Sequence, residues 1–218
     1  MLRVPPGRRD VAVFARSTTF KGQPDAVEAG IALVRDEIAP ALEQMDGCVG
    51  MSMLVDREVG GCVVTSAWDS EQAMRASEQQ VGPLRDRAQR VWGDRPEVRR
   101  WEIAVLHRLR PAPAGACARV TWSRAEPGEV DAVLDVFRTH VLPRMEDLAG
   151  FCSSSLLVDR TTGDAALATT YESRAALERS REAATGLRSD AAELMTADIV
   201  DVAEFEVVLA HLRVPETV

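Results

Sequence analysis

The chain contains the same pattern twice, and this internal repeat constrains its fold more than any other feature. The tetrapeptide Leu-Val-Asp-Arg at 54–57 recurs at 157–160, which sets an offset of 103 residues. At this offset, residues 40–77 and 143–180 are identical at twelve of 38 positions without a gap. Self-similarity at a fixed period indicates a duplicated unit. We therefore predict two domains, residues 10–109 and 116–213, joined by a short linker that contains proline and glycine.

Each half begins with a predicted strand and an amphipathic helix. Short β-rich runs at 11–15 and 118–122 predict the strands. Apolar residues at spacings of three and four then predict helices over 27–45 and 130–148. Both helices contain a proline at the same place, which predicts a kink, and a glycine follows each helix where a left-handed C-cap is expected. These residues are Pro40, Pro143, Gly47 and Gly150.

The rest of each half predicts a hairpin, a second helix and a last strand. The hairpin strands of the first half are predicted at 49–55 and 62–68. The last strand is predicted at 101–107 in the first half and at 205–211 in the second. Ser70 and Ser173 are candidate N-caps of the second helix, which Gly82-Pro83 is expected to interrupt in the first half only. The repeated tetrapeptides lie beside the hairpin turns, where we expect Asp56-Arg57 and Asp159-Arg160 to have structural roles.

This order, β-α-β-β-α-β, is the ferredoxin-like arrangement and belongs to the α+β class. One copy would leave one face of its sheet open to water. We therefore predict that the two repeats pack sheet to sheet within the chain. The outer sheet edges that remain favour a homodimer of the duplicated chain.

Composition and charge exclude several partners. There are 34 acidic and 26 basic residues, a net charge of −8 and a pI of about 5.0, which argues against nucleic-acid binding. The N-terminus lacks the apolar region of a signal peptide, and no segment has 18 consecutive apolar residues, so we expect no membrane partner and a cytoplasmic location. The four cysteines form no C-x-x-C pair and are expected to be reduced and buried.

The third strand of each half ends in an aromatic residue, an acid and a helix-capping serine. The two segments are Trp68-Asp69-Ser70 and Tyr171-Glu172-Ser173. Together with the duplicated element order, they resemble the dimeric α+β barrel superfamily and, within it, the antibiotic biosynthesis monooxygenase domains. The resemblance covers nearly the whole chain, twice. It implies a fold used by cofactor-independent oxygenases of polyketide anthrones, haem-degrading enzymes and muconolactone isomerases, so fold alone does not fix the function.

The haem-degrading members of this superfamily are a poor match. The resemblance implies that they need an Asn on the first strand and a His on the second helix. This chain has no Asn, and Ser77 and Ser180 stand near the position where the His would be expected. The three histidines, His107, His140 and His211, fall on the predicted last strands and on a first helix.

Cofactor-independent oxygenation fits the remaining residues better, and we expect neither a cofactor nor a metal. In that chemistry O2 reacts with the carbanion of a phenolic substrate, whose anion is stabilised by a fixed cation or hydrogen-bond donors. We predict Trp68 and Arg85 as catalytic residues, because an indole stacks on a planar ring and a guanidinium stabilises a phenolate. The predicted ligand contacts are Phe14, Arg16, Trp92, Trp122, Arg124, Tyr171 and Arg188.

Two functions therefore stay open. One is a cofactor-independent monooxygenase, or a related isomerase or cyclase, that acts on an aromatic or polyketide-like small molecule. The other is a non-catalytic protein that binds a small aromatic ligand or haem. The repeats have diverged, with Trp92 aligned with Met195 and Cys48 with Phe151. We therefore expect two unequal pockets and place the working one in the first half, which is richer in Trp and Arg.

Overall fold

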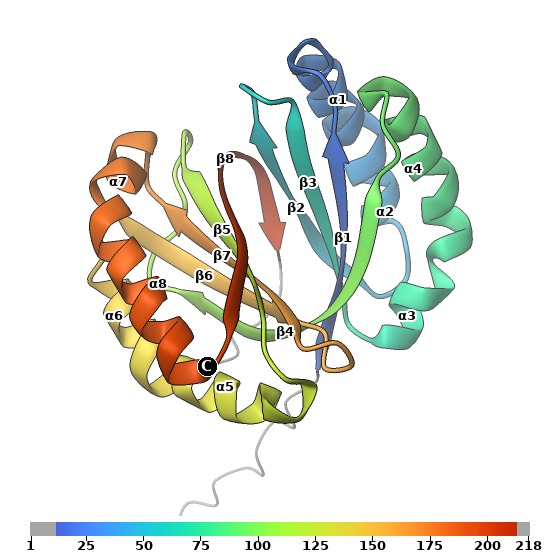
Figure 1. Cartoon of the computed structure of the whole chain (residues 1–218). Helices are drawn as coiled ribbons and strands as arrows, with labels where there is room; N and C mark the ends of the chain where they lie inside the picture. The colour runs from blue at the N-terminus through green and yellow to red at the C-terminus, as the bar shows by residue number, and fades with distance from the viewer. Residues whose placement is uncertain (1–11, 213–218) are drawn as a thin grey trace, which may run out of the picture.

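The computed structural model describes residues 12–212, in which one order of elements occurs twice (Figure 1). The first repeat consists of β1 (Val13–Lys21), α1 (Val27–Leu33), α2 (Ala39–Glu43), β2 (Cys48–Asp56), β3 (Gly61–Trp68), α3 (Glu71–Ala76), α4 (Glu78–Trp92) and β4 (Glu97–Arg108). The second repeat consists of β5 (Cys117–Arg124), α5 (Val130–Val136), α6 (Leu142–Glu146), β6 (Phe151–Val158), β7 (Asp164–Tyr171), α7 (Arg174–Arg179), α8 (Arg181–Met195) and β8 (Asp198–Leu212).

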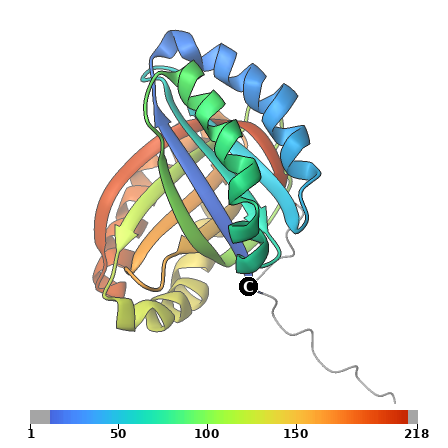
Figure 2. The ribbon, with the colours of Figure 1, turned by 90° about the vertical axis from the view of Figure 1, so that its right-hand side faces the viewer.

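The eight strands form one closed antiparallel barrel in the order β1-β3-β2-β8-β5-β7-β6-β4. The last strand of each repeat joins the two repeats, because β4 pairs with β1 and β6, and β8 pairs with β5 and β2. The helices of the two repeats cover opposite sides of the barrel (Figures 1 and 2). The predicted α+β fold of two ferredoxin-like repeats packed sheet to sheet is confirmed. In the closed barrel each described strand has two neighbours, so the outer edges that favoured a homodimer are largely covered.

Alternating side chains of each strand face either the helices or the barrel interior. On β1, for example, Arg16 and Phe20 face the helices of the first repeat, whereas Ser17, Thr19 and Lys21 face the interior. Each repeat therefore has its own hydrophobic core between sheet and helices, and further apolar clusters fill part of the barrel.

The predicted kink at Pro40 and Pro143 is confirmed as a π-helical turn. Residues 34–38 and 137–141 form this turn, and each proline is the second residue of the helix that follows. The wider turn accommodates a residue that cannot donate a backbone hydrogen bond.

The predicted break at Gly82-Pro83 is wrong, because α4 runs through both residues. The carbonyl of Gln79, which loses its helical donor at Pro83, belongs to an exposed residue and can bind water instead. Gly82 also has no Cβ to clash with the proline ring. The second helix is instead interrupted in both repeats, at Ser77 and Ser180.

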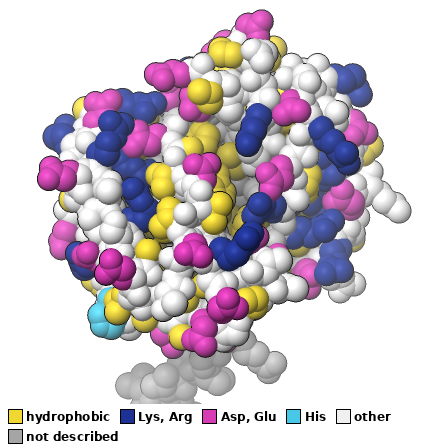
Figure 3. Space-filling view, in the orientation of Figure 1, with side chains coloured by type: hydrophobic (Ala, Val, Ile, Leu, Met, Phe, Trp, Pro, Cys, Tyr) yellow, Lys and Arg dark blue, Asp and Glu magenta, His cyan; other side chains and the backbone are white. Residues whose placement is uncertain are grey.

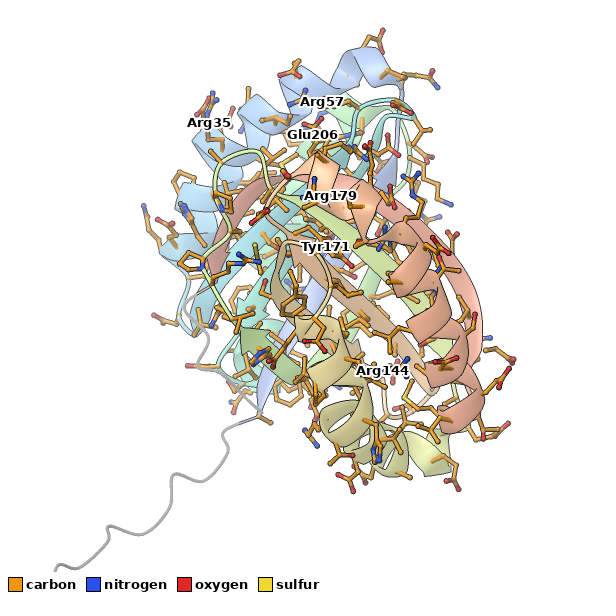
Figure 4. The ribbon with its side chains drawn as sticks, turned by 90° about the vertical axis from the view of Figure 1, so that its left-hand side faces the viewer. Arg35, Arg57, Arg144, Tyr171, Arg179 and Glu206 are labelled. Atoms are coloured by element: carbon orange, nitrogen blue, oxygen red, sulfur yellow. The ribbon has the colours of Figure 1, made fainter. Side chains whose placement is uncertain are left out.

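The repeated tetrapeptide connects the two repeats. Arg57 Nε lies 2.7 Å from the carboxylate of Glu206 on β8, and the two side chains are adjacent in Figure 4. Arg160 Nε lies 2.7 Å from the carboxylate of Glu102 on β4. Each arginine also binds a carboxylate on the first helix of its own repeat. The expected structural role of these residues is thus borne out by their contacts.

The expected helix ends are also present. Ser70 Oγ accepts a hydrogen bond from the amide of Ala73, and Ser173 Oγ accepts one from Ala176. Gly47 and Gly150 have φ values of +77° and +71°, in the left-handed region. A Cβ on Gly150 would lie 2.4 Å from the Cβ of Ala176. Both the positive φ and this close contact therefore disfavour any side chain at position 150.

We expect Gly150→Ala to lower the free energy of unfolding by about 2 kcal/mol, because alanine disfavours positive φ and the new methyl group would clash with α7. The matched control is Gly186→Ala on α8, where a Cβ would meet no atom within 4 Å. That change should raise stability by about 0.5–1 kcal/mol through helix propensity. Urea unfolding of both variants checks the contrast, and equal effects would contradict it.

Candidate functional site

Each repeat has a cavity between its sheet and its helices, and the two differ in size. The second-repeat cavity, between β5–β7 and α5–α8, has a volume of about 100 Å³, whereas the first-repeat cavity has about 40 Å³. The expectation of two unequal pockets is therefore met. The larger one lies in the second repeat, whereas the sequence prediction placed the working pocket in the first.

One tryptophan accounts for much of this difference. The ring of Trp92 stacks on Phe20 with centroids 5.0 Å apart, and the aligned residues in the second repeat are Met195 and Ser123. The indole lies so close to α1 that a Cβ on Gly30 would be 2.1 Å from it, and the aligned residue is Val133. Trp92 thus occupies space that stays open in the second repeat.

The second-repeat cavity is apolar, with polar groups mainly on its sheet wall. Its apolar lining includes Val133, Phe137, Leu167, Leu187 and Met195. Its polar lining includes Arg119, Thr121, Thr169 and Tyr171 on the sheet and Arg188 on α8. An apolar cavity with a few convergent polar groups is typical of a small-molecule site. Figure 4 shows Tyr171 inside this repeat.

Arg119 on β5 organises the polar wall. Its buried guanidinium donates to the hydroxyl of Tyr171 (3.1 Å), to the carbonyl of Leu177 (3.1 Å) and to the carboxylate of Glu204 (2.8 Å). Arginine can only donate, so the Tyr171 oxygen is the acceptor and its proton remains available. Within residues 12–212 that proton has no acceptor, so Tyr171 can donate it to a ligand.

Arg16 is the equivalent residue of the first repeat, and its guanidinium lies 5.7 Å from the ring centre of Trp68. Its carboxylate partner is Glu78 on α4, at 3.1 Å. In the second repeat Arg181 is aligned with Glu78, and the carboxylate comes from Glu204 on β8. Each buried arginine therefore has an acidic partner. The partner lies on helix α4 in the first repeat and on strand β8 in the second.

Charge and burial shift several pKa values in the second repeat. Burial opposes the charged form of Glu204, but hydrogen bonds from Arg181 and Arg119 outweigh it and lower the pKa of this carboxyl. Burial lowers the pKa of Arg188, and repulsion from Arg119 adds to the effect. Arg188 has no ion-pair partner among the described residues, so its charge is available to a ligand.

Glu204→Gln should destabilise the protein by about 2–3 kcal/mol at pH 7, since it removes charge-assisted hydrogen bonds from a buried guanidinium. The folded-state pKa lies below the unfolded value of about 4.3, so the ion pair stabilises the fold above that pH and is lost as the pH falls through the folded pKa. The difference from the unchanged chain should therefore shrink below about pH 4. Urea unfolding across pH measures it, with exposed Glu193→Gln as the control. A constant difference would contradict the prediction.

The predicted residues of the first repeat lie in or near its core. Trp68 is fully buried and donates from Nε1 to Ser66 Oγ (3.0 Å). Arg85 lines the first-repeat cavity and binds Glu78 at 2.9 Å. Phe14 lines a separate surface depression beside β4. These three residues, with Arg16 and Trp92, do not form one open pocket.

The other predicted residues divide between two places. Trp122 and Arg124 face the barrel interior, where Arg124 Nε lies 2.5 Å from Asp164. Tyr171 and Arg188 line the second-repeat cavity. The sequence prediction missed Arg119 and named the strand-end residue Arg124 on the same strand instead. The offset of 103 relates Arg16 to Arg119 and is the signal that could have found it.

The four cysteines are unpaired thiols; three are buried and Cys48 is half-buried. Burial raises the pKa of each thiol, so none is an activated nucleophile. Within residues 12–212, no helix is long and apolar enough to cross a membrane.

Comparison with known proteins identifies relatives that cover most of the chain. Residues 14–82 match the antibiotic biosynthesis monooxygenase family model. The Mycobacterium tuberculosis proteins Rv2557 and Rv2558, both named as uncharacterised, are 47% and 48% identical over 206 and 211 residues. The alignments cover 94% and 96% of this chain and 92% and 89% of those proteins. The structure of an anthrone oxidase-like protein has the same fold, with a TM-score of 0.69 at 13% identity over 94% of both chains.

Proposed function

Because the chain belongs to the family of Rv2557 and Rv2558 and carries an antibiotic biosynthesis monooxygenase domain, we propose that it is a cofactor-independent monooxygenase. Its substrate is a phenolic, polyketide-like aromatic molecule that binds in the second-repeat cavity. The observation that carries this proposal is a pair of polar groups at that cavity. They are the Tyr171 hydroxyl proton, which has no acceptor, and the Arg188 guanidinium, which donates to Thr185 Oγ1 (3.2 Å) but has no ion-pair partner within residues 12–212.

The apolar wall of the cavity would hold the aromatic rings of the substrate. Phe137 and Leu187 supply rigid contacts, and Met145 and Met195 can adapt their conformation to ligands of different shape. A ligand that enters from the helix side would bring its oxygen toward the sheet wall, where Tyr171 and Arg119 lie.

The polar groups would stabilise the substrate as its anion. Tyr171 donates a hydrogen bond to the phenolic oxygen, and Arg188 supplies a positive charge in a low-dielectric setting, where both interactions are strengthened. Arg119 donates a hydrogen bond to the Tyr171 oxygen, so the hydroxyl proton of Tyr171 points to the ligand instead. The phenolic proton leaves to water at the open side of the cavity.

Oxygen can then react with the carbanion form of the ring. The substrate supplies the electrons: a ring CH2 becomes C=O, one oxygen atom of O2 enters the product, and the other leaves as water. This balance needs no electron donor other than the substrate. The protein's part is to bind the anion and to limit the access of water.

A second candidate function rests on what the cavity lacks. No histidine lines it among the described residues, and its one lining carboxylate, Asp164, is paired with Arg124 and Arg99. A site without a free base could bind a phenol without oxidising it. Binding without turnover is therefore the alternative that the experiments below distinguish.

Tyr171→Phe and Arg188→Gln should each lower the rate of quinone formation from anthrone in air by about 100-fold, the typical cost of losing one anion-stabilising donor. Arg85→Gln is the matched control, because it changes the aligned arginine of the first repeat. Absorbance of the quinone measures the rate. Loss of activity in Arg85→Gln alone would place the site in the first repeat, and binding of anthrone without quinone would establish the binding protein.

Filling the second-repeat cavity should weaken both binding and oxidation. The double change Val133→Gly and Met195→Trp copies the Gly30–Trp92 contact, in which a glycine makes room for the indole. Anthrone binding should fall by at least about tenfold, the effect of losing one ring-sized contact. Calorimetric titration measures binding, and Val133→Gly alone is the control that enlarges the cavity. Full activity of the double variant would refute the assignment.

A further inference from the structure

We propose that the barrel interior is a second ligand site, which takes an uncharged planar aromatic compound that carries hydroxyl or carbonyl groups. The interior contains a cavity of about 220 Å³, larger than either cavity between sheet and helices. The sheet separates it from most of the second-repeat cavity, with which it shares the lining residues Ser123, Asp164 and Ala165. The barrel site does not depend on the proposed function. Figure 3 shows a hollow between the two halves, with hydrophobic side chains in it and charged side chains around it.

Small side chains on the inner strand faces create the space. Ala166 and Ala168 on β7 contribute little volume, and Val63 and Thr65 line the cavity from β3. An apolar cavity of about 150 Å³ is enough to bind benzene. The barrel cavity is therefore large enough for a ligand of more than one ring.

Two indoles make the site suited to a flat ligand. Trp101 projects from β4 and Trp122 from β5, and these strands are not neighbours in the barrel. Trp101 is fixed by a hydrogen bond from Nε1 to Ser17 Oγ (2.8 Å), and Trp122 packs edge-on against Phe205. Rigid aromatic side chains on separate walls favour a planar ring by stacking and edge contacts.

The charged groups of the rim largely neutralise one another, which argues for an uncharged ligand. Asp164 binds both Arg124 (2.5 Å) and Arg99 (3.2 Å), and Arg99 also binds Glu97 (2.5 Å). The other charged lining residues, Lys21 and Asp201, are opposite in sign. The rim therefore has no excess charge to select an anion or a cation.

Polar groups remain that can orient the ligand. The hydroxyls of Thr19 and Thr65 line the cavity, and the ammonium of Lys21 has no ion-pair partner within residues 12–212. These groups can donate to a hydroxyl or carbonyl oxygen on the ring. An aromatic compound without oxygen would leave them unused, so a phenol or aryl ketone fits better.

The test uses two neighbouring residues of β7 that face opposite sides of the sheet. Ala168 faces the barrel cavity and Leu167 faces the second-repeat cavity. Calorimetric titration of the full chain with 2-naphthol gives the number of bound equivalents for the unchanged protein, Ala168→Phe and Leu167→Phe. Thr65→Phe blocks the barrel from another strand, should Ala168→Phe fail to fold, and urea unfolding verifies each variant.

Ala168→Phe should lose one equivalent of 2-naphthol, whereas Leu167→Phe keeps that equivalent. Trp122→Ala should weaken the same binding event at least tenfold. A second outcome is that the unchanged protein binds a single equivalent, which Ala168→Phe and Thr65→Phe remove and Leu167→Phe does not. That result supports the barrel site and contradicts the proposed function for this class of ligand. Unchanged binding in Ala168→Phe and Thr65→Phe, or no binding to the unchanged protein, overturns the barrel site.

Discussion

The pairing of each last strand with both repeats is the interaction on which the rest of the molecule depends. Strand β4 pairs with β6, and β8 pairs with β2, so neither sheet can close without the other repeat. Closure gives each described strand two neighbours, and β4 and β8 each pair with one repeat along one half of their length and with the other repeat along the rest. It also gives the sheet two distinct faces, one under helices and one around the barrel interior, and thereby determines where cavities can form.

A buried arginine then links sheet and helices in each repeat. Arg16 and Arg119 each bind a backbone carbonyl and a serine at the helix break, Ser77 or Ser180, and each needs one carboxylate to offset the cost of burial. In the second repeat that carboxylate comes from β8, the strand that also joins the repeats. The polar wall of the larger cavity is therefore tied to barrel closure, and its geometry follows from the fold rather than from mobile loops.

The sequence predicts features that depend on local chemistry or on the repeat. The fold follows from the offset of 103, and the caps at Ser70, Ser173, Gly47 and Gly150 follow from side-chain and backbone preferences. The last strand β8 begins at Asp198, well before the predicted 205–211, because pairing with β5 stabilises a segment that also contains the acidic residues Asp198, Asp201 and Glu204, which lack strand propensity. Which repeat has the open cavity could not be predicted. Trp92 fills the corresponding space in the first repeat because it packs against Gly30, and this contact is not visible in the sequence.

Duplication within one chain allows the two sites to diverge while the barrel stays closed. In a symmetric dimer of single repeats, Trp92 and Gly30 would occur in both subunits, and both cavities would be filled. In the first repeat the indole of Trp92 is part of the hydrophobic core and stacks on Phe20. The buried surface of these two rings stabilises the shared barrel. The second repeat has Val133, Ser123 and Met195 in their place and keeps an open cavity beside Tyr171 and Arg188. The larger number of tryptophans in the first repeat is thus a sign of packing, and the repeat with smaller side chains has the space for a ligand.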